Sequence, residues 1–284
     1  MMILIVGRTS SGKDYFAERL TEKGLSIVKS YTTRARRTPD EDTHIFVTEE
    51  EAAKITNKAA TTIIKGHEYF GTTDQVENSD IYIIDPRGLY QITENMPDES
   101  FLVVYVSADP EIRRQRAIAR AMPSEELTDE EKAEKEKDIG EDFDMRNADE
   151  DEQFSKFETQ IEIFKTAEDP WGESNIPQNV VGILYYKNDF TMPTLVENAN
   201  AVLDYQNRYD NIKALVEEAI ELNLLTLHEG YISVMAKGHD TDDALGTHVS
   251  KDTFISYLTG SKASLGDLLF KVWNARAVRD GKFL

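Results

Sequence analysis

Two glycines and a lysine near the start of the chain have the types and spacing of a phosphate-binding loop. Gly7 is followed by four residues and then by Gly12 and Lys13, which gives the pattern G-x-x-x-x-G-K. In such a loop, backbone N–H groups wrap a phosphate at a helix N-terminus, and the lysine reaches the outer phosphates as a point charge. The pattern predicts an ATP-binding loop that also contains Ser10 and Ser11.

Asp14 follows this lysine, at the position where a serine or threonine hydroxyl ordinarily binds magnesium. Its carboxylate can hold the ion directly or through water, and it repels phosphate when no metal is bound. Ile3 to Val6 is a continuous apolar run, typical of a strand buried on both faces, and Asp14 to Leu20 is predicted to open a helix. This context favours a phosphate loop over a chance glycine turn.

A second set of phosphate-type side chains lies in the segment SYTTRARR, residues 30–37. It follows a short predicted strand, Leu25 to Lys29. Arginine forks match phosphate oxygens bidentately, and hydroxyl groups can complete the shell. Taken alone, the segment could be a solvated basic turn, but beside a phosphate loop it predicts a second phosphate site.

Several segments, in their order and spacing, resemble the guanylate kinase family of nucleoside monophosphate kinases. After the phosphate loop come SYTTRARR, THIFV, HEYFGT and IYIIDPRG. The resemblance implies a kinase domain over residues 1–207, with an acceptor-binding insert at about 31–79 and a lid at about 121–152. It also implies ATP as phosphoryl donor, Mg²⁺ as cofactor and small-molecule nucleotides as partners.

The resemblance assigns the phosphate of the acceptor to Ser30, Arg34 and Arg37. The family's next segment contributes a tyrosine to the same phosphate, and His44 stands at that position here. Its imidazole can still donate a hydrogen bond, and its charge can change near neutral pH. These groups would hold the acceptor phosphate in line with the transferred group.

The segment HEYFGT implies further acceptor contacts from Tyr69, Phe70 and Thr72. Phe70 replaces a phosphate-binding tyrosine of the family and lacks its hydroxyl. The family's guanine-reading glutamate falls on or near Thr61, whose hydroxyl cannot offer guanine a paired acceptor, and Glu68 is the alternative if the register differs. A pyrimidine, modified or deoxy nucleotide, or a phosphorylated sugar, therefore stays open as the acceptor.

Strands alternating with helices are predicted along the rest of residues 1–207. Ile81 to Ile84, Phe101 to Ser107 and Val180 to Tyr186 are apolar strands. This alternation predicts an α/β fold, a parallel sheet with helices on both faces and ligands at the carboxyl ends of the strands. Asp85 ends the first of these strands, where it either holds magnesium through water or caps the following helix.

Arginines follow on the predicted helix Asp109 to Ala121. Arg116 and Arg120 lie four residues apart and share one helical face. The resemblance implies that they clamp the donor phosphates as catalytic residues, together with Arg146 of the lid. It also implies that Asn188 lies near the donor adenine.

Two further helices are predicted in the second half of this region. Pro123 to Glu152 is the most acidic tract and is expected to be a solvated helix with ion pairs. Glu152 to Phe164 has apolar residues at spacings of three and four, which predicts a separate amphipathic helix packed on the core. Another helix is predicted at Pro193 to Tyr205.

Residues 208–284 are expected to form a small C-terminal α+β module, for which no family resemblance is found. The pattern predicts helices at about 212–220, 254–258 and 265–278 and a hairpin around Glu229 and Gly230. The segment GHDTDD, residues 238–243, has metal-ligand residue types, but a polar turn is the favoured interpretation. A homodimer contact or a protein partner is open for this module.

Composition excludes several classes of protein. The net charge is −21, from 32 basic and 53 acidic side chains, which argues against affinity for nucleic acid or anionic membranes. The chain has no cysteine, so disulfides and thiolate zinc sites are excluded. Without a signal peptide pattern or a long apolar span, we expect a soluble, cytoplasmic protein.

Two functions from different classes remain. One is a nucleoside monophosphate kinase, and the other is a guanylate-kinase-like scaffold that binds proteins and has lost catalysis. Such scaffolds tend to have a degraded phosphate loop, whereas Gly7, Gly12 and Lys13 are intact here. The loop therefore favours the enzyme, while the changes at Asp14 and Phe70 keep the scaffold open.

Overall fold

A four-stranded parallel sheet forms the centre of the computed structural model, which describes residues 1–122, 127–166, 175–188, 192–222, 224–225, 227–228, 231–234 and 247–260. The strand order is β6-β1-β7-β8, with strands at Met2–Val6 (β1), Ile81–Ile83 (β6), Phe101–Ser107 (β7) and Val180–Lys187 (β8). All of β1 and nearly all of β7 are buried, as expected for parallel strands covered on both faces. The predicted α/β fold is confirmed.

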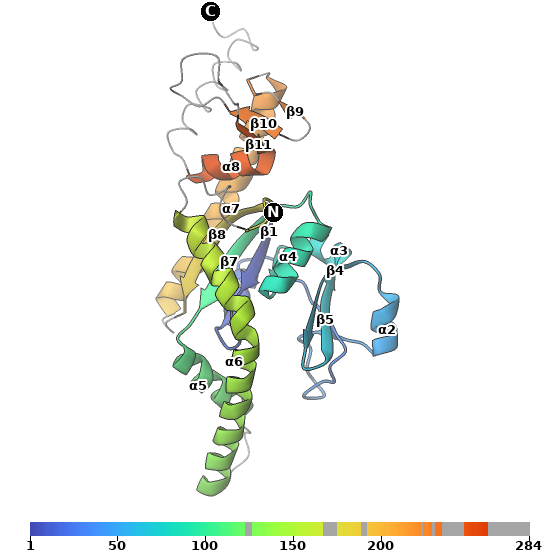
Figure 1. The fold of residues 1–284 in the computed structure, drawn as a ribbon, viewed down its shortest axis with the longest axis vertical. Coiled ribbons are helices and arrows are strands. Elements are labelled where there is room, and N and C mark those ends of the chain that lie inside the picture. Colours follow the sequence, from blue (N-terminus) through green and yellow to red (C-terminus); the bar gives the residue numbers. More distant parts are fainter. Residues whose placement is uncertain are drawn as a thin grey trace, which may run out of the picture.

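Helices cover both faces of this sheet (Figure 1). They are α4 (Pro86–Asn95) and α6 (Asp129–Thr166) on one face, and α1 (Lys13–Thr21) and α7 (Met192–Glu221) on the other. Leu4 of β1 shares a buried cluster with Phe157 of α6, whereas the next residue, Ile5, shares one with Phe16 of α1. Successive residues of a strand point to opposite faces, so β1 supplies both halves of the core.

The strand predicted at Leu25 to Lys29 is reduced to a single parallel bridge between Ile27 and Ile81. The Asp80 carboxylate accepts hydrogen bonds from the backbone N–H and the hydroxyl of Ser26. The Asp80 side chain therefore takes the Ser26 backbone N–H, which a longer pairing with β6 would need. The prediction of a full strand at Leu25 to Lys29 is wrong.

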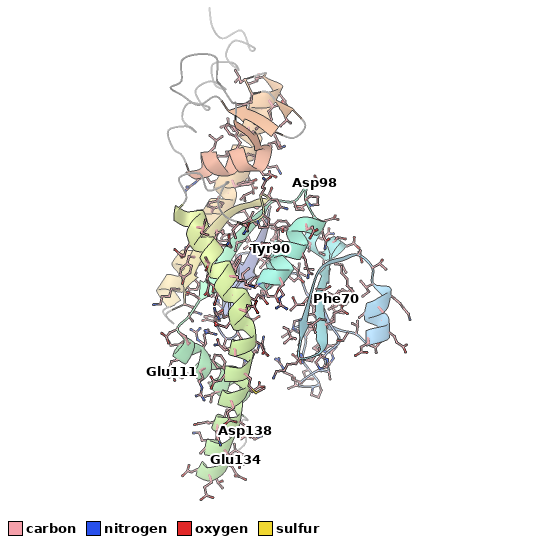
Figure 2. All side chains as sticks on the ribbon, in the orientation of Figure 1. Phe70, Tyr90, Asp98, Glu111, Glu134 and Asp138 are labelled. Atoms are coloured by element: carbon pink, nitrogen blue, oxygen red, sulfur yellow. The ribbon has the colours of Figure 1, made fainter. Side chains whose placement is uncertain are left out.

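Two helices are longer than the sequence pattern predicted. α6 is one helix of 38 residues, where a break near Glu152 was expected. Ion pairs four residues apart, Arg146 with Glu150 and Lys156 with Glu152, support the helix on both sides of the expected break, and the helix also continues through Gly140. Figure 2 shows Glu134 and Asp138 on the end of α6 that extends beyond the sheets, where both side chains are exposed.

α7 also continues through the expected boundary at residues 207 and 208. It has no glycine, and its one proline is at its second position, so the sequence carries no signal to stop there. The Tyr209 hydroxyl lies 3.3 Å from Ser100 Oγ and 3.2 Å from Asp252 Oδ1, which links the sheet to the C-terminal helix α8 (Lys251–Gly260). The division of the chain into two domains stays a prediction.

A second sheet stands beside the central one and is built from residues 31–72. Its order is β3-β2-β5-β4, with strands at Tyr31–Thr32 (β2), Ile45–Phe46 (β3), Lys58–Ile64 (β4) and His67–Thr72 (β5), and helices α2 (Glu49–Lys54) and α3 (Thr73–Glu77) complete it. Lys65 and Gly66 both have positive φ, which is the geometry of a tight two-residue hairpin turn. The long hairpin β4–β5 faces α6 across the cavity described below (Figure 1).

The described C-terminal residues form an antiparallel sheet in the order β11-β10-β9, packed with α8 against the end of α7. The strands are Leu227–His228 (β9), Tyr231–Val234 (β10) and Thr247–Ser250 (β11). The predicted hairpin and the helix at 254–258 are confirmed, while residues 238–243 and 265–278 lie outside the described residues. Among the helices described, none has the length and apolar character needed to cross a membrane.

Candidate active site

The phosphate loop lies between β1 and α1, and two of its positions require glycine. A Cβ on Gly7 would lie 2.2 Å from the carbonyl oxygen of Val106, because the loop passes directly over β7. Gly12 has a φ of +97°, and a Cβ there would lie 2.1 Å from Asn188 Nδ2. The two glycines of the motif are thus needed for the loop to fit between the sheet and the helix.

Side chains from behind hold the carbonyl groups of this loop. Asn188 Nδ2 and Arg116 Nη1 donate to the Ser11 carbonyl at 2.8 and 3.0 Å, and the buried Arg113 approaches the Thr9 carbonyl at 3.4 Å. Arg116 lies on α5 (Pro110–Ala121) and Asn188 directly follows β8. Both side chains contact loop carbonyls here, and the roles of Arg116 at the donor phosphates and of Asn188 near the adenine stay predictions.

Lys13 folds back over the loop. Its Nζ donates to the carbonyls of Gly7 and Arg8 at 2.6 and 3.0 Å, and burial lowers the pKa of its ammonium group. The hydroxyls of Ser10 and Ser11 are buried without a hydrogen-bond partner. Unpaired buried hydroxyls are uncommon, but neither serine lines the cavity described below.

The predicted acceptor residues meet on the second sheet. The Arg34 guanidinium donates through Nε to the Tyr69 hydroxyl at 3.1 Å. Ser30 Oγ lies 3.0 Å from His44 Nδ1, and the His44 ring packs edge-on against the ring of Tyr69. Burial, and then the charge of Arg34, lower the pKa of His44, so its imidazole is neutral at neutral pH.

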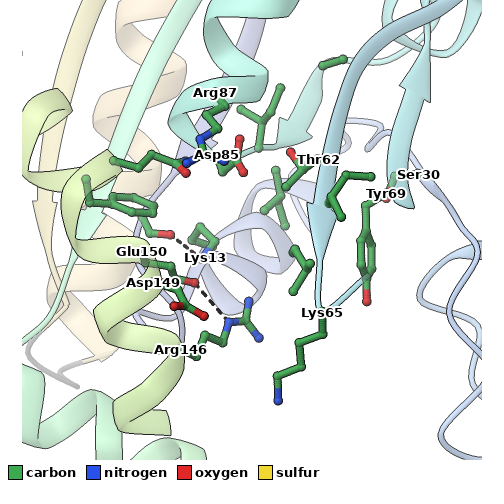
Figure 3. A pocket seen from close by; sticks show the side chains of 18 of the residues that line it. Lys13, Ser30, Thr62, Lys65, Tyr69, Asp85, Arg87, Arg146, Asp149 and Glu150 are labelled. Carbon is green, nitrogen blue, oxygen red and sulfur yellow. Dashed lines mark hydrogen bonds and ion pairs between the residues drawn. The ribbon is translucent and has the colours of Figure 1, made fainter. Parts of the chain in front are cut away.

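One cavity of about 560 Å³ separates the phosphate loop from these acceptor residues. Gly7 and Lys13 line it on the loop side, and Ser30, His44 and Tyr69 line it on the other. Figure 3 shows this arrangement, with the hairpin β4–β5 opposite α6. Two sites of phosphate-binding type therefore face each other across a common space.

Cationic side chains from separate elements influence one another near this cavity, which Lys13 and Arg146 line. The pKa of Arg120 is lowered by burial, then by the charge of Arg37, and also by that of Arg146. Arg146 and Arg120 in turn help to lower the pKa of Lys13. Cations that lower one another's pKa repel one another, and an anionic ligand placed among them stabilises their charged forms.

The two predicted magnesium ligands differ in their surroundings. Asp85 lines the cavity and also caps α4, because its Oδ1 accepts from the Gly88 N–H at 2.7 Å. Asp14 is exposed in the first turn of α1. The described residues contain no cluster of three His, Cys, Asp or Glu that could hold a metal. One or two carboxylates with phosphate oxygens and waters are nevertheless a usual set for Mg²⁺, so these residues fit it.

Three acceptor positions differ from the expected register. Tyr69 faces the cavity, whereas Phe70 is fully buried and stacked on Tyr31 with 5.1 Å between ring centroids. The cavity is lined by Thr62 and not by Thr61, whose backbone N–H donates to Gln91. Thr72 caps α3. Because residues alternate between the faces of a strand, a shift of one position reverses each assignment.

Two carboxylates that the sequence motifs did not indicate lie at the phosphate-type sites. Glu41 accepts two hydrogen bonds from the Arg34 guanidinium, at 2.7 and 3.1 Å. Glu150 of α6 accepts from the backbone N–H of Thr9 at 2.9 Å and from Arg146 at 3.1 Å. Only the position of Glu41, a few residues after an arginine-rich segment, could have suggested such a contact.

Comparison with known proteins gives similarity of fold only. No protein family model matches the chain, and no curated protein matches it. A solved guanylate kinase from Anaplasma phagocytophilum aligns over 71% of this chain and 81% of its own, with 17% identity and a TM-score of 0.38. An uncharacterized protein from Eubacterium ventriosum ATCC 27560 aligns over 72% and 97%, with 12% identity and a TM-score of 0.31.

Proposed function

We propose that the protein is a kinase that transfers a phosphoryl group from ATP to a nucleoside monophosphate. The observation that carries the proposal is the pair of phosphate-type sites on opposite walls of one cavity. Gly7 and Lys13 support a ligand at the loop, and Ser30 and Tyr69 on the opposite wall, with Arg34 bonded to the Tyr69 hydroxyl, support a second anion.

Phosphoryl transfer needs alignment and neutralisation of charge more than covalent chemistry. In the proposed reaction, Lys13 and the loop amides hold the donor phosphates, and Ser30 and Arg34 hold the acceptor phosphate in line with them. Arg120 and Arg146 neutralise the charge on the transferred group. The attacking oxygen belongs to a phosphate that is already anionic, so no general base is required.

Magnesium would be held by Asp85, Asp14 or both, and it supplies neutralisation of the phosphate oxygens of ATP. The lid helix α6 covers one side of the cavity with Arg146 and Glu150. By excluding water it would keep ATP from hydrolysis and direct the phosphoryl group to the acceptor.

The part of the cavity away from the loop would receive the rest of the acceptor. It is lined by Ala60, Thr62, Tyr82 and Arg87. A threonine cannot present the paired acceptors that guanine needs, so we propose an altered base specificity. The panel of candidate acceptors therefore includes ribo- and deoxynucleoside monophosphates of all bases and phosphorylated sugars.

The test is ADP release from magnesium ATP with each member of this panel. We expect one acceptor class to give turnover that depends on both substrates. A complete lack of turnover with every acceptor would contradict the proposed activity.

A scaffold without catalysis is the second candidate, and the carboxylates of Glu41 and Glu150 at the two phosphate-type sites favour it. The melting temperature with and without magnesium ATP separates the two functions. A nucleotide-binding enzyme is stabilised by millimolar ATP, because a ligand that binds only the folded state raises its stability. A scaffold with filled sites shows no shift.

A further inference from the structure

The Glu41 carboxylate is bound to Arg34, one of the residues proposed to hold the acceptor phosphate. Its two oxygens accept from both terminal nitrogens of Arg34, from the backbone N–H of Arg37 at 2.6 Å and from the Thr43 hydroxyl at 3.1 Å. The side chain is only 9% exposed, and these donors lower its pKa to about 2. Glu41 is therefore a fully ionised anion with four hydrogen-bond donors directed at it.

These donors are the type that a phosphate group uses. A guanidinium fork, a backbone N–H and a hydroxyl bind phosphate oxygens as readily as they bind a carboxylate. The Arg34 guanidinium also donates to Tyr69 and to the Ala35 carbonyl, so four of its five N–H groups are in use in this structure. An acceptor phosphate can bind both terminal nitrogens of Arg34 through this fork only if it takes over the bonds that Glu41 now makes.

We propose that Glu41 is an internal ligand of the acceptor site, and that acceptor binding exchanges its carboxylate for the acceptor phosphate. The proposal rests on the proposed function, because that function makes this site the acceptor site. Glu41 then acts as a specificity-determining residue. A terminal phosphate monoester carries close to two negative charges at neutral pH, whereas the carboxylate carries one, so only a strongly anionic group competes well for Arg34.

The exchange predicts a definite effect on affinity. When a site is available only part of the time, the apparent dissociation constant rises by the inverse of the available fraction. A neutral amide at position 41 keeps the size of the side chain but forms weaker hydrogen bonds than a carboxylate does. Glu41→Gln should therefore make the site available more often and tighten phosphate binding by roughly tenfold.

The experiment measures binding of inorganic phosphate to the full chain by isothermal titration calorimetry, at slightly alkaline pH where phosphate is mainly dianionic. Wild type is compared with Glu41→Gln and with the matched control Asp42→Asn. Asp42 is the adjacent carboxylate and pairs with Lys29 at the surface, so its loss gives the same charge change without freeing Arg34. Glu41→Gln should bind about tenfold more tightly, and Asp42→Asn should stay within about twofold of wild type.

Melting temperatures give a second readout if Glu41→Gln weakens the fold. Without phosphate, the variant should melt below wild type, because the donors of Arg34 and Arg37 lose their charged partner. Saturating phosphate should close this gap, since phosphate takes over the same donors. An ion pair that only braces the loop would leave the gap unchanged, and this result would overturn the proposal.

Arg34→Ala identifies the site, because it should remove the tightening when combined with Glu41→Gln. Unchanged or weaker phosphate binding by Glu41→Gln, or no binding by either protein, overturns the exchange. The kinase proposal is judged separately by turnover. Tighter phosphate binding without any turnover would support the exchange and contradict the kinase. Turnover without tighter phosphate binding would support the kinase and contradict the exchange.

Discussion

The phosphate loop and the proposed acceptor site are built in different ways. The phosphate loop is held from behind by side chains of the central fold, namely the buried Arg113 and Asn188 and the half-buried Arg116. The acceptor loop is largely exposed between residues 35 and 40, and the carboxylate of Glu41 holds its arginine. The phosphate loop is therefore held mainly by side chains packed behind it, with Glu150 bound to the Thr9 N–H, whereas Arg34 at the second site is held by the Glu41 carboxylate.

The largest expected effect lies on the donor side. Lys13→Ala should lower kcat/KM by roughly 10²–10³-fold or more, because it removes a preorganised charge next to the transferred group. The matched control is Lys23→Ala, an exposed lysine just past the other end of α1. Steady-state ADP release checks both variants. Equal activity of Lys13→Ala and wild type would show that the loop is not the donor site.

The next largest effect is expected on kcat, from Arg120 of α5. Arg120→Ala should lower kcat by about 10²-fold, because Arg120 belongs to the cationic group around Lys13. Arg114→Ala is its control on the same helix, since Arg114 approaches Asp144 of α6. Single-turnover rates at saturating substrates separate the chemical step from binding. A larger fall in kcat for Arg114→Ala than for Arg120→Ala would show that the reaction does not take place in this cavity.

A reciprocal pair of variants tests which residue of β5, Tyr69 or Phe70, faces the proposed acceptor. Tyr69→Phe should raise the acceptor KM by up to about tenfold, because the Tyr69 hydroxyl accepts from Arg34 at the cavity. Phe70→Tyr should leave KM unchanged and cost about 1–3 kcal/mol of stability, because its new hydroxyl would be buried against Tyr31. Kinetics and urea unfolding check the pair. A lower KM in Phe70→Tyr would restore the register that the family resemblance implies.

The smallest effect concerns pH. The pKa of His44 is lowered from its ordinary value of 6.5, so the unfolded chain binds the proton more readily than the folded one. The stability associated with neutral His44 is complete above pH 6.5 and is lost as the pH falls through the lowered pKa. His44→Gln should flatten this part of the profile in urea unfolding at a series of pH values. An unchanged slope in the variant would assign the loss to other groups.

Sequence alone could predict the strand, loop and helix at the start of the chain because their parts are local. A buried strand, two glycines and a lysine fix the loop within one short segment, and the parallel sheet follows from apolar runs such as Phe101–Ser107. The roles of Asn188 and Arg116 could not be predicted in the same way, because they depend on how β8 and α5 pack behind the loop.

The acceptor side was harder to predict for a related reason. Whether Tyr69 or Phe70 faces the cavity depends on the pairing of β5 with β2 and β4, and a one-residue shift exchanges them. The continuity of α6 and α7 was missed because a change in hydrophobic pattern is not a signal to stop a helix. The contact between Glu41 and Arg34 depends on the path of an irregular loop, which has no periodic pattern.

The central claim is that the donor and acceptor sites share one cavity and exchange a phosphoryl group across it. The most direct measurement follows ATP labelled in its γ-phosphoryl group in the presence of magnesium and the preferred acceptor. The account predicts that the label moves to the acceptor, giving a doubly phosphorylated product and ADP, and that Lys13→Ala abolishes this transfer. Label that appears only as inorganic phosphate, or stays in ATP with every acceptor, would contradict it.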